Sequence, residues 1–181
     1  MNPDIRLDAF RSQYAGMDKD AFLARFPSPF LLINTTGLDV RREKADKAGG
    51  GRKSTILQDP ENAESTVFTL IYPVETSERS GAGSAVTVGR AAENDIIVPN
   101  PCVSRRHAVF QGDAAGEAFT ITDVGSSYGT ALEGRRLPSG KAVPIQPGDT
   151  IVFGQAAHCT FLSAEDLFRF LQTMEQVEED T

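Results

Sequence analysis

The sequence predicts an all-β fold, a twisted β-sandwich of two antiparallel-rich sheets, with short N-terminal helices and a C-terminal helix. Two observations predict this class. From residue 66 onward, short runs with alternating apolar residues follow one another along the chain. Turn-forming residues separate these runs, as in Pro99-Asn100-Pro101 and Pro147-Gly148-Asp149.

Length and charge restrict the class of protein further. The chain has 181 residues, of which 40% are hydrophobic, enough for one packed domain with extensions. Its formal charge of −7 disfavours nucleic acid and anionic membranes as partners. No apolar run is long enough to cross a bilayer, and the start of the chain lacks the features of a signal peptide. We therefore expect a cytoplasmic protein.

Residues 1–36 read as an N-terminal extension with helices and one strand. Apolar residues at helical spacing predict a short helix within Asp4–Tyr14, and Asp18 is placed to cap a second one. Prolines after Phe26 end the second helix, and Phe30–Ile33 reads as a buried strand. We expect this extension to cover a face or an edge of the sandwich, with partner binding as the alternative.

Residues 37–65 are rich in charge, glycine and small polar side chains, so we predict a flexible loop or linker there. Residues 66–162 form the predicted sandwich. Val67–Tyr72 is apolar on both faces, which favours a strand that is covered on each side. Residues 163–181 are expected to form a helix and an acidic tail, with Ser163 and Asp166 as a capping pair.

The remaining strands of the sandwich are predicted from alternating or apolar runs between turn signals. They are Val86–Val88, Asp95–Val98, Ala108–Phe110, Phe119–Thr122, Ile151–Phe153 and Ala157–Phe161, with a hairpin at Leu132–Gly134.

Three phrases follow predicted strands and carry the candidate site. They are Thr87–Arg90, Ser104–Ala108 and Asp123–Thr130. Loops on a rigid sheet form binding rims, and guanidinium and hydroxyl groups are donors suited to phosphate. The arginines in or after these phrases would make a basic patch on an acidic body, with at least Arg106 or Arg136 simply solvated; the five are Arg90, Arg105, Arg106, Arg135 and Arg136.

The two cysteines, Cys102 and Cys159, give no support for a disulfide or a metal site. Cys159 alternates with apolar neighbours, so we expect it in the core. The paired spacing of structural zinc ligands is missing. We expect no metal and no cofactor.

Taken together, the phrases resemble the forkhead-associated (FHA) domain. That family shows Gly-Arg after a strand, then Ser-x-x-His, then Asp-x-x-Ser-x-Asn-Gly-Thr, and these patterns are similar to Gly89-Arg90, Ser104–His107 and Asp123–Thr130. Residues 147–154 also resemble the closing turn and strand of the family. The resemblance covers about residues 66–162.

The resemblance implies a β-sandwich that binds phosphothreonine peptides through loops at one end. It assigns Arg90, Ser104 and Ser127 to the phosphate and places Arg105 beside the peptide. His107 would support the Ser104 loop, and Gly89, Gly129 and Thr130 would be structural. The implied partner is a phosphothreonine-containing protein in bacterial-type or other Ser/Thr kinase signalling, either a kinase or its substrate.

One position departs from the family pattern. Tyr128 stands where most members have Asn, whose amide contacts the ligand backbone. Tyrosine has no amide, but its ring could pack on the ligand or its hydroxyl could reach the phosphate. We favour a functional phosphopeptide-binding site that includes Tyr128 and has a changed peptide specificity. The alternative is a phosphate-independent interaction module with a degenerate site.

An enzyme is the remaining alternative. Ser104, His107 and Asp123 could be drawn as a nucleophile, a base and an orienting acid. However, Ser104 lacks the Gly-x-Ser-x-Gly elbow, and the chain has no phosphate-binding Gly-x-x-x-x-Gly-Lys loop. We therefore expect no catalytic activity.

Overall fold

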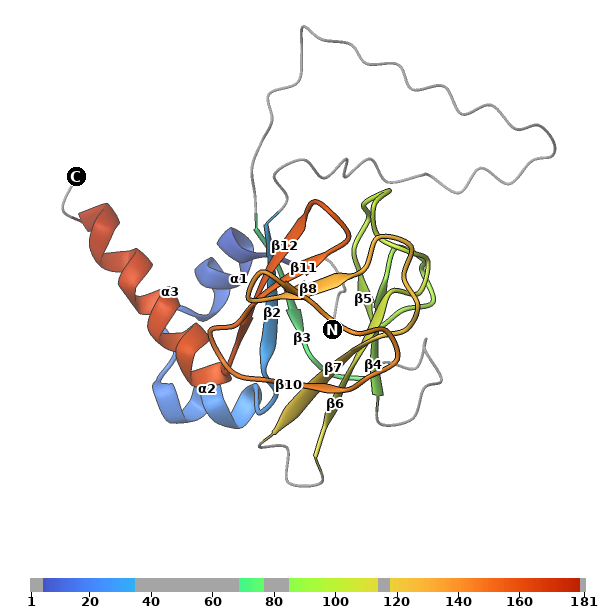
Figure 1. The fold of residues 1–181 in the computed structure, drawn as a ribbon. Coiled ribbons are helices and arrows are strands. Elements are labelled where there is room, and N and C mark those ends of the chain that lie inside the picture. Colours follow the sequence, from blue (N-terminus) through green and yellow to red (C-terminus); the bar gives the residue numbers. More distant parts are fainter. Residues whose placement is uncertain (1–4, 35–68, 77–84, 114–117, 180–181) are drawn as a thin grey trace, which may run out of the picture.

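The computed structural model of the chain describes residues 5–34, 69–76, 85–113 and 118–179, and its two β-sheets lie face to face (Figure 1). The seven-stranded sheet has the order β1 (Ile5–Arg6), β3 (Thr69–Pro73), β2 (Phe30–Asn34), β12 (Ala157–Leu162), β11 (Thr150–Phe153), β8 (Thr130–Leu132) and β9 (Arg135–Arg136). The five-stranded sheet has the order β10 (Val143–Ile145), β7 (Phe119–Asp123), β6 (Ala108–Gly112), β4 (Ala85–Gly89) and β5 (Ile96–Ile97).

Almost all strand pairs are antiparallel, as the sequence predicts, and β4 with β5 is a parallel exception. The core between the sheets is built from alternate residues of the facing strands. Val86 and Val88 of β4 and Phe110 of β6 contribute from one sheet, and Cys159 and Phe161 of β12 contribute from the other. The predicted burial of Cys159 is therefore confirmed, and both cysteines are free.

The strand β2 lies in the interior of the seven-stranded sheet, between β3 and β12. Leu31 and Ile33 point into the core between the sheets, whereas Phe30 and Leu32 point to the outer face. Phe30–Asn34, which belongs to the predicted extension of residues 1–36, is thus hydrogen-bonded to strands of the 66–162 region. The N-terminal segment does cover the sheet, but it also supplies one of its central strands.

Three helices cover the outer face of the seven-stranded sheet: α1 (Leu7–Tyr14), α2 (Lys19–Arg25) and α3 (Ala164–Glu179) (Figure 1). The predicted cap of α2 is confirmed, because the Asp18 side chain accepts from the backbone N–H groups of Asp20 and Ala21. The short helix predicted within Asp4–Tyr14 is α1, which begins at Leu7. Ile5 and Arg6 instead pair with β3 at the edge of the sheet.

The capping pair predicted for the C-terminal helix is also confirmed. The hydroxyl of Ser163 accepts from the backbone N–H of Asp166 and donates to its carboxylate. Aromatic side chains from all three helices and from β2 then fill the outer layer. Phe10, Phe22 and Phe30 are almost completely buried in it, beside Leu167 and Leu171 of α3.

The pairing register brings the ends of several strands together. Val88 of β4 lies opposite Ala108 of β6, and Ala108 lies opposite Asp123 of β7. In the other sheet, Thr130 of β8 lies opposite Phe153 of β11. The loops that carry the three sequence phrases therefore leave the sandwich at the same end.

Among the described residues, no helix is both long and apolar enough to span a bilayer. The predicted linker at residues 37–65 and the last two residues of the acidic tail lie outside the described residues.

The inclusion of β2 in the core can be tested by truncating a side chain. Replacing the fully buried Leu31 by alanine is expected to lower the free energy of unfolding by about 2–5 kcal/mol, because it opens a cavity between the sheets. The measurement is urea-induced unfolding of the full chain. Phe170→Ala is the control, since Phe170 is 39% exposed on α3 and should change stability by less than about 1 kcal/mol. Equal losses for the two variants would contradict a core role for β2.

Candidate functional site

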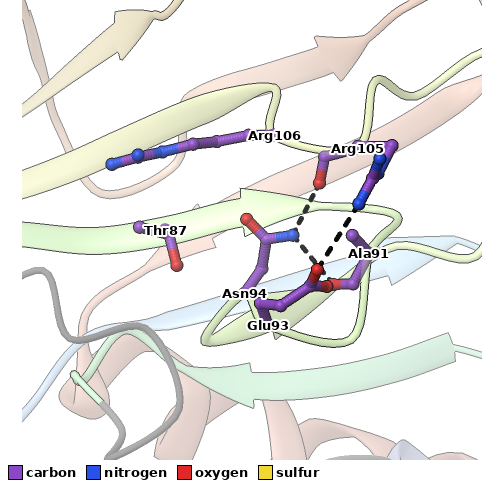
Figure 2. A pocket seen from close by; sticks show the side chains of 6 residues that line it. All are labelled: Thr87, Ala91, Glu93, Asn94, Arg105 and Arg106. Carbon is purple, nitrogen blue, oxygen red and sulfur yellow. Dashed lines mark hydrogen bonds and ion pairs between the residues drawn. The ribbon is translucent and has the colours of Figure 1, made fainter.

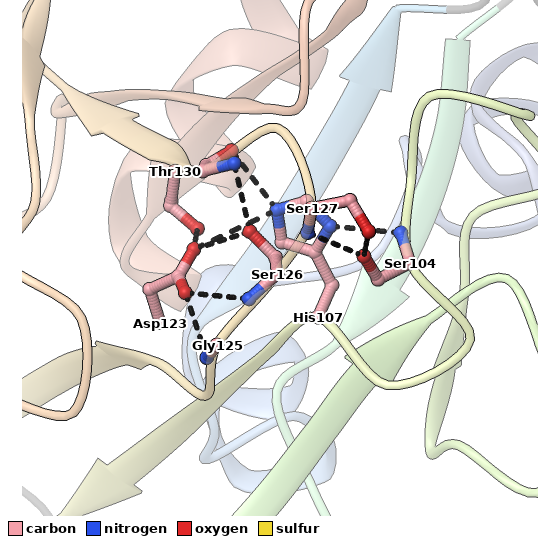
Figure 3. Close-up of polar contacts among 8 residues, drawn as sticks. Ser104, His107, Asp123, Gly125, Ser126, Ser127 and Thr130 are labelled. Atoms are coloured by element: carbon pink, nitrogen blue, oxygen red, sulfur yellow. Dashed lines mark hydrogen bonds and ion pairs between the residues drawn. The ribbon is translucent and has the colours of Figure 1, made fainter.

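Two serine hydroxyls meet at the end of the sandwich, one from each of two loops. Ser104 lies in the β5–β6 loop and Ser127 in the β7–β8 loop, and their Oγ atoms are 3.5 Å apart. The backbone N–H of Ser127 donates to Ser104 Oγ at 3.0 Å, which orients that oxygen (Figure 3). The Ser104 hydroxyl donates to Ser127 Oγ across this 3.5 Å contact, which is long for a hydrogen bond between two hydroxyls, so an anion placed between them could compete for both hydroxyl protons.

Arg90 directly follows β4, and its backbone lies beside Ser104. Its backbone N–H donates to the Ser104 carbonyl at 3.0 Å, and its side chain is exposed. The sequence-predicted phosphate donors Arg90, Ser104 and Ser127 thus lie in adjoining segments on one rim.

His107 connects the β5–β6 loop, which carries Ser104, to the β7–β8 loop, which carries Ser127. Its Nδ1 accepts from the Ser104 backbone N–H at 3.0 Å, which requires Nδ1 to be unprotonated. Its Nε2 therefore carries the proton and donates to the Gly129 carbonyl at 3.1 Å. The ring is fully buried against Phe153, and burial lowers the pKa of His107 despite opposing contributions from Gly129 and Asp123. The imidazole is thus neutral in the folded protein.

Asp123 fixes the conformation of the β7–β8 loop. Its carboxylate accepts from the backbone N–H groups of Gly125 and Ser126 and from the hydroxyls of Ser126 and Thr130 (Figure 3). Burial raises the pKa of Asp123, but these hydrogen bonds together outweigh it and hold the pKa below its ordinary value. The Ser126 hydroxyl also accepts from the Gly129 N–H, which closes the loop.

The sequence prediction did not include Asn94, which holds the β4–β5 loop against the Ser104 loop. The Asn94 side-chain amide donates to the carbonyls of Ala91 and Arg105 at 2.8 and 2.7 Å (Figure 2). Gly89 permits this approach, because a Cβ there would lie 2.3 Å from the Arg105 carbonyl oxygen. No spacing in the sequence singles out Asn94. The role of Ser126 was also missed, although Asp followed by Ser three residues later is a recognisable turn signal.

Glycine is required at residue 129 as well. Its φ is +82°, and a Cβ would lie within 2.8 Å of the Arg136 guanidinium. Thr130 is buried and hydrogen-bonded to Asp123, so both residues contribute to the shape of the loop rather than offering free donors.

The other arginines are placed differently from one another. Arg105 is exposed, with its guanidinium 3.6 Å from Glu93. Arg106 is also exposed and extends in another direction, and both line a hollow of about 340 Å³ beside Asn94 (Figure 2). Arg136 lies over Gly129, so solvation alone does not describe it.

An apolar surface accompanies the polar rim. Tyr128 is 51% exposed and Val124 is 40% exposed, and both belong to the β7–β8 loop. The Tyr128 side chain makes no hydrogen bond within the described part of the chain, so its ring faces solvent next to Ser127.

The geometry does not form a catalytic triad. His107 binds the backbone N–H of Ser104 rather than its hydroxyl, and its other nitrogen binds the Gly129 carbonyl. The Asp123 carboxylate is 3.9 Å from His107 Nε2, on the same nitrogen that donates to Gly129. Neither ring nitrogen is placed to take a proton from Ser104 Oγ.

These features define a β-sandwich whose polar binding rim is built on loops at one end. Comparison with known families identifies the class more closely, because residues 86–154 match the family model named FHA domain. Residues 86–154 are therefore similar to FHA domains, as the sequence phrases predict.

Individual relatives agree with this assignment. The chain is 44% identical over 69 residues to the oxoglutarate dehydrogenase inhibitor of Corynebacterium efficiens, covering 38% of this chain and 45% of the inhibitor. It is 27% identical over 155 residues to the glycogen accumulation regulator GarA of Mycobacterium tuberculosis, covering 86% and 85% of the two chains. Several curated relatives are much longer, and the chain spans less than half of their length.

Among solved structures, Mycobacterium tuberculosis EmbR in complex with a low-affinity phosphopeptide is 34% identical, with a TM-score of 0.39. That match covers 44% of this chain and 20% of EmbR.

The buried His107 predicts a pH dependence of stability. Its pKa in the folded protein lies below its ordinary value of 6.5, so the unfolded chain binds more protons as the pH falls. Wild-type stability should therefore decline from about pH 6.5 downward, relative to His107→Gln, which keeps an uncharged donor and acceptor. Asp123 does not contribute in this window, because its lowered pKa matters only below its ordinary 3.8.

The measurement is urea-induced unfolding of both proteins between pH 5 and pH 8. All other side chains are the same in the two proteins, so the difference between their stabilities reports residue 107 alone. Parallel stability curves for the two proteins would contradict a neutral, buried imidazole.

The role of Asn94 can be tested with its neighbour as control. Asn94→Ala removes two side-chain hydrogen bonds, although each carbonyl keeps a backbone donor, and at about 0.5–1.5 kcal/mol per bond it should cost about 1–3 kcal/mol of stability. Glu93→Ala removes only an exposed carboxylate and should cost less than about 1 kcal/mol. Thermal unfolding of both variants measures the difference, and a loss confined to Glu93→Ala would refute the assigned role.

Proposed function

We propose that this chain is a non-catalytic module that binds phosphothreonine-containing peptides in Ser/Thr kinase signalling. The observation that carries the proposal is the convergence of Ser104 and Ser127, with hydroxyls 3.5 Å apart, beside the exposed Arg90. A phosphate group offers three acceptor oxygens and about −1.5 to −2 charges, which matches one guanidinium and two hydroxyls.

The hydrogen bonds of the β7–β8 loop favour binding of an anion from another molecule rather than of a carboxylate of this chain. The Asp123 carboxylate accepts from four donors of its own loop, and these donors do not include the hydroxyls of Ser104 and Ser127. The formal charge of −7 would repel extended polyanions, whereas a local group of arginines attracts a single charged side chain.

Energetic considerations favour a reversible interaction. Each charge-assisted hydrogen bond is worth about 1.5–3 kcal/mol, and association itself costs several kcal/mol. Three donors with a few backbone contacts therefore give a modest affinity. Such an affinity suits a signal that must be reversed.

The non-catalytic part of the proposal rests on the engagement of His107 with two backbone groups. Two relatives are named an inhibitor and a regulator, which supports a role in controlling other proteins. A partner kinase or kinase substrate in the cytoplasm completes the proposal, with Arg105 and Tyr128 contacting the peptide around the phosphothreonine.

A second candidate function is phosphate-independent protein binding. The exposed rings and methyl groups of Tyr128 and Val124 favour it, because exposed apolar residues beside a loop rim suit a peptide contact without phosphate. The two functions differ in a simple observation. Equal binding to phosphorylated and unphosphorylated forms of the same peptide would favour this second candidate.

Removal of the Arg90 guanidinium tests the proposed function. Arg90→Ala is expected to weaken binding of a phosphothreonine peptide by about 10- to 100-fold or more, since at least one charge-assisted bond is lost. The stability of the protein should change by less than about 0.5 kcal/mol, because the side chain is exposed. A phosphothreonine peptide array identifies a ligand, and titration calorimetry measures its affinity for each variant.

Arg169→Ala is the matched control, because this exposed arginine lies on α3, away from the serine loops. It should bind the peptide like the wild type. Unchanged affinity in Arg90→Ala would refute the assignment of the phosphate site.

A further inference from the structure

Ser139 carries an exposed hydroxyl in the turn between β9 and β10. The backbone N–H of Lys141 donates to the Pro138 carbonyl at 3.3 Å, which closes a β-turn. Gly140 has a φ of +74°, whereas Ser139 is not among the residues of positive φ, so the turn is of type II. The Ser139 side chain is exposed and makes no hydrogen bond within the described part of the chain. Its hydroxyl is therefore accessible to another molecule.

The backbone that leads to this hydroxyl is extended. Arg135 and Arg136 form β9, and Leu137 precedes a proline, which restricts it to the extended region. As the second residue of a type II turn, Ser139 has a φ of about −60° and a ψ of about +120°, close to polyproline II. Since β9 is the last strand of its sheet, its outer edge has no partner strand in the described ranges. An enzyme groove that binds an extended substrate can therefore reach this segment.

Basic side chains precede the hydroxyl. Arg136 lies three residues before Ser139 and Arg135 lies four residues before it, and both arginines are exposed. Among the described residues, neither guanidinium forms an ion pair with a carboxylate. Guanidinium groups pair with carboxylates in a bidentate geometry, and charge patterns of this kind distinguish the substrates of different kinases. The segment thus fits a Ser/Thr kinase with an acidic substrate groove.

Ser28 provides a comparison, because Ser28 and Ser139 are the two described serines or threonines with a basic residue three positions before them. The Arg25 guanidinium lies 5.5 Å from the ring centroid of Tyr14 and 5.6 Å from that of Phe26, so the fold already engages it. Ser28 itself is half-buried and follows closely on the buried Phe26. Of the two sites, Ser139 is the one at which both the hydroxyl and the arginine are accessible.

We propose that Ser139 is a phosphorylation site for an ATP-dependent Ser/Thr kinase that recognises Arg136. In the reaction, Ser139 Oγ forms a bond to the γ-phosphorus of ATP as the bond between that phosphorus and the β–γ bridging oxygen breaks. The hydroxyl proton passes to a carboxylate of the kinase, and ADP leaves. The product carries about −1.5 to −2 charges at residue 139.

A phosphate at Ser139 lies beside the β7–β8 loop. The N–H of Leu137 donates to the carbonyl of Thr130, the first residue of β8, at 2.8 Å. The N–H of Gly140 donates to the carbonyl of Asp123, the last residue of β7, also at 2.8 Å. The segment with the phosphate therefore contacts both ends of the loop that belongs to the proposed phosphopeptide site. Because its charge repels a bound phosphothreonine, phosphorylation weakens ligand binding, and this part of the inference rests on the proposed function.

Phosphorylation of the full-length protein tests the inference. A purified Ser/Thr kinase that requires Arg three residues before the acceptor is verified on a synthetic Arg-x-x-Ser peptide and then supplied with the protein and ATP. Trypsin releases Leu137–Lys141, in which Ser139 is the hydroxyl residue, and mass spectrometry measures the phosphorylated fraction. Wild type should be phosphorylated there. Arg136→Gln should slow the reaction about tenfold or more, because a charge-assisted contact with the kinase is lost.

Lys141→Gln is the matched control, because Lys141 is an exposed cation of the same turn on the other side of the acceptor. It should be phosphorylated like the wild type. Ser28 is the internal control in each protein, and its tryptic fragment Phe26–Arg41 should stay unmodified. Thermal unfolding of Arg136→Gln establishes that the variant keeps its fold.

The effect on binding is measured with the best phosphothreonine peptide from the array. Protein phosphorylated at Ser139 should bind this peptide about two- to fivefold more weakly than unmodified protein at low salt. The difference should shrink in about 0.5 M salt, because salt screens the repulsion between separate charges. Removal of the phosphate by a phosphatase should restore the original affinity.

Separate results bear on the two parts of the inference. An unmodified Leu137–Lys141 fragment, in a reaction that phosphorylates the synthetic peptide, would overturn the phosphorylation site. An unchanged rate in Arg136→Gln, or equal modification of Ser28, would do the same. Equal affinities of the modified and unmodified proteins would overturn the effect on binding. If unmodified protein binds no phosphothreonine peptide better than its unphosphorylated form, the proposed function fails, and mass spectrometry still decides the phosphorylation site.

Discussion

The neutral imidazole of His107 is the interaction on which the binding rim depends. One nitrogen accepts from the loop that leads into β6, and the other donates to Gly129, the residue just before β8. Since β6 and β8 belong to different sheets, this single ring couples the rim across the sandwich. Its two roles require one protonated and one unprotonated nitrogen, which only the neutral form supplies.

The charged side chains around the serine loops differ in how they are hydrogen-bonded. The carboxylate of Asp123 carries a negative charge close to the proposed phosphate site, and four donors of its own loop are hydrogen-bonded to it. The arginines, by contrast, are exposed and poorly paired. The buried Asp123 carboxylate is satisfied by hydrogen bonds, whereas Arg90, Arg105 and Arg106 are exposed, with Glu93 as an exposed carboxylate beside Arg105, on a protein of net charge −7.

Most strands of the sandwich were predictable because alternation of apolar residues reports burial directly. Which strands pair with one another was harder to predict from the sequence. β2 and β12 are neighbours in the sheet but lie near opposite ends of the chain, and nothing in either pattern names its partner. The two-residue β1 was missed for another reason, since a segment so short has no measurable period and its apolar residue also fits the helix that follows.

The candidate site likewise has residues that the sequence predicted and residues that it did not. The motif phrases identified Arg90, Ser104, His107 and the β7–β8 loop, because the residues within each phrase are close together in sequence. Asn94 could not be found this way, since it acts through a close approach to the backbone of another segment. Such approaches depend on three-dimensional packing around glycine, which a linear pattern does not contain.

The position of Tyr128 follows from how its loop is built. The loop conformation is set by the Asp123 carboxylate, the Ser126 hydroxyl and the positive φ of Gly129. The Tyr128 side chain contributes to none of these contacts and is 51% exposed. A change of side chain at residue 128 therefore alters the surface offered to a ligand while the donors at Ser104 and Ser127 stay in place, which favours altered specificity over a degenerate site.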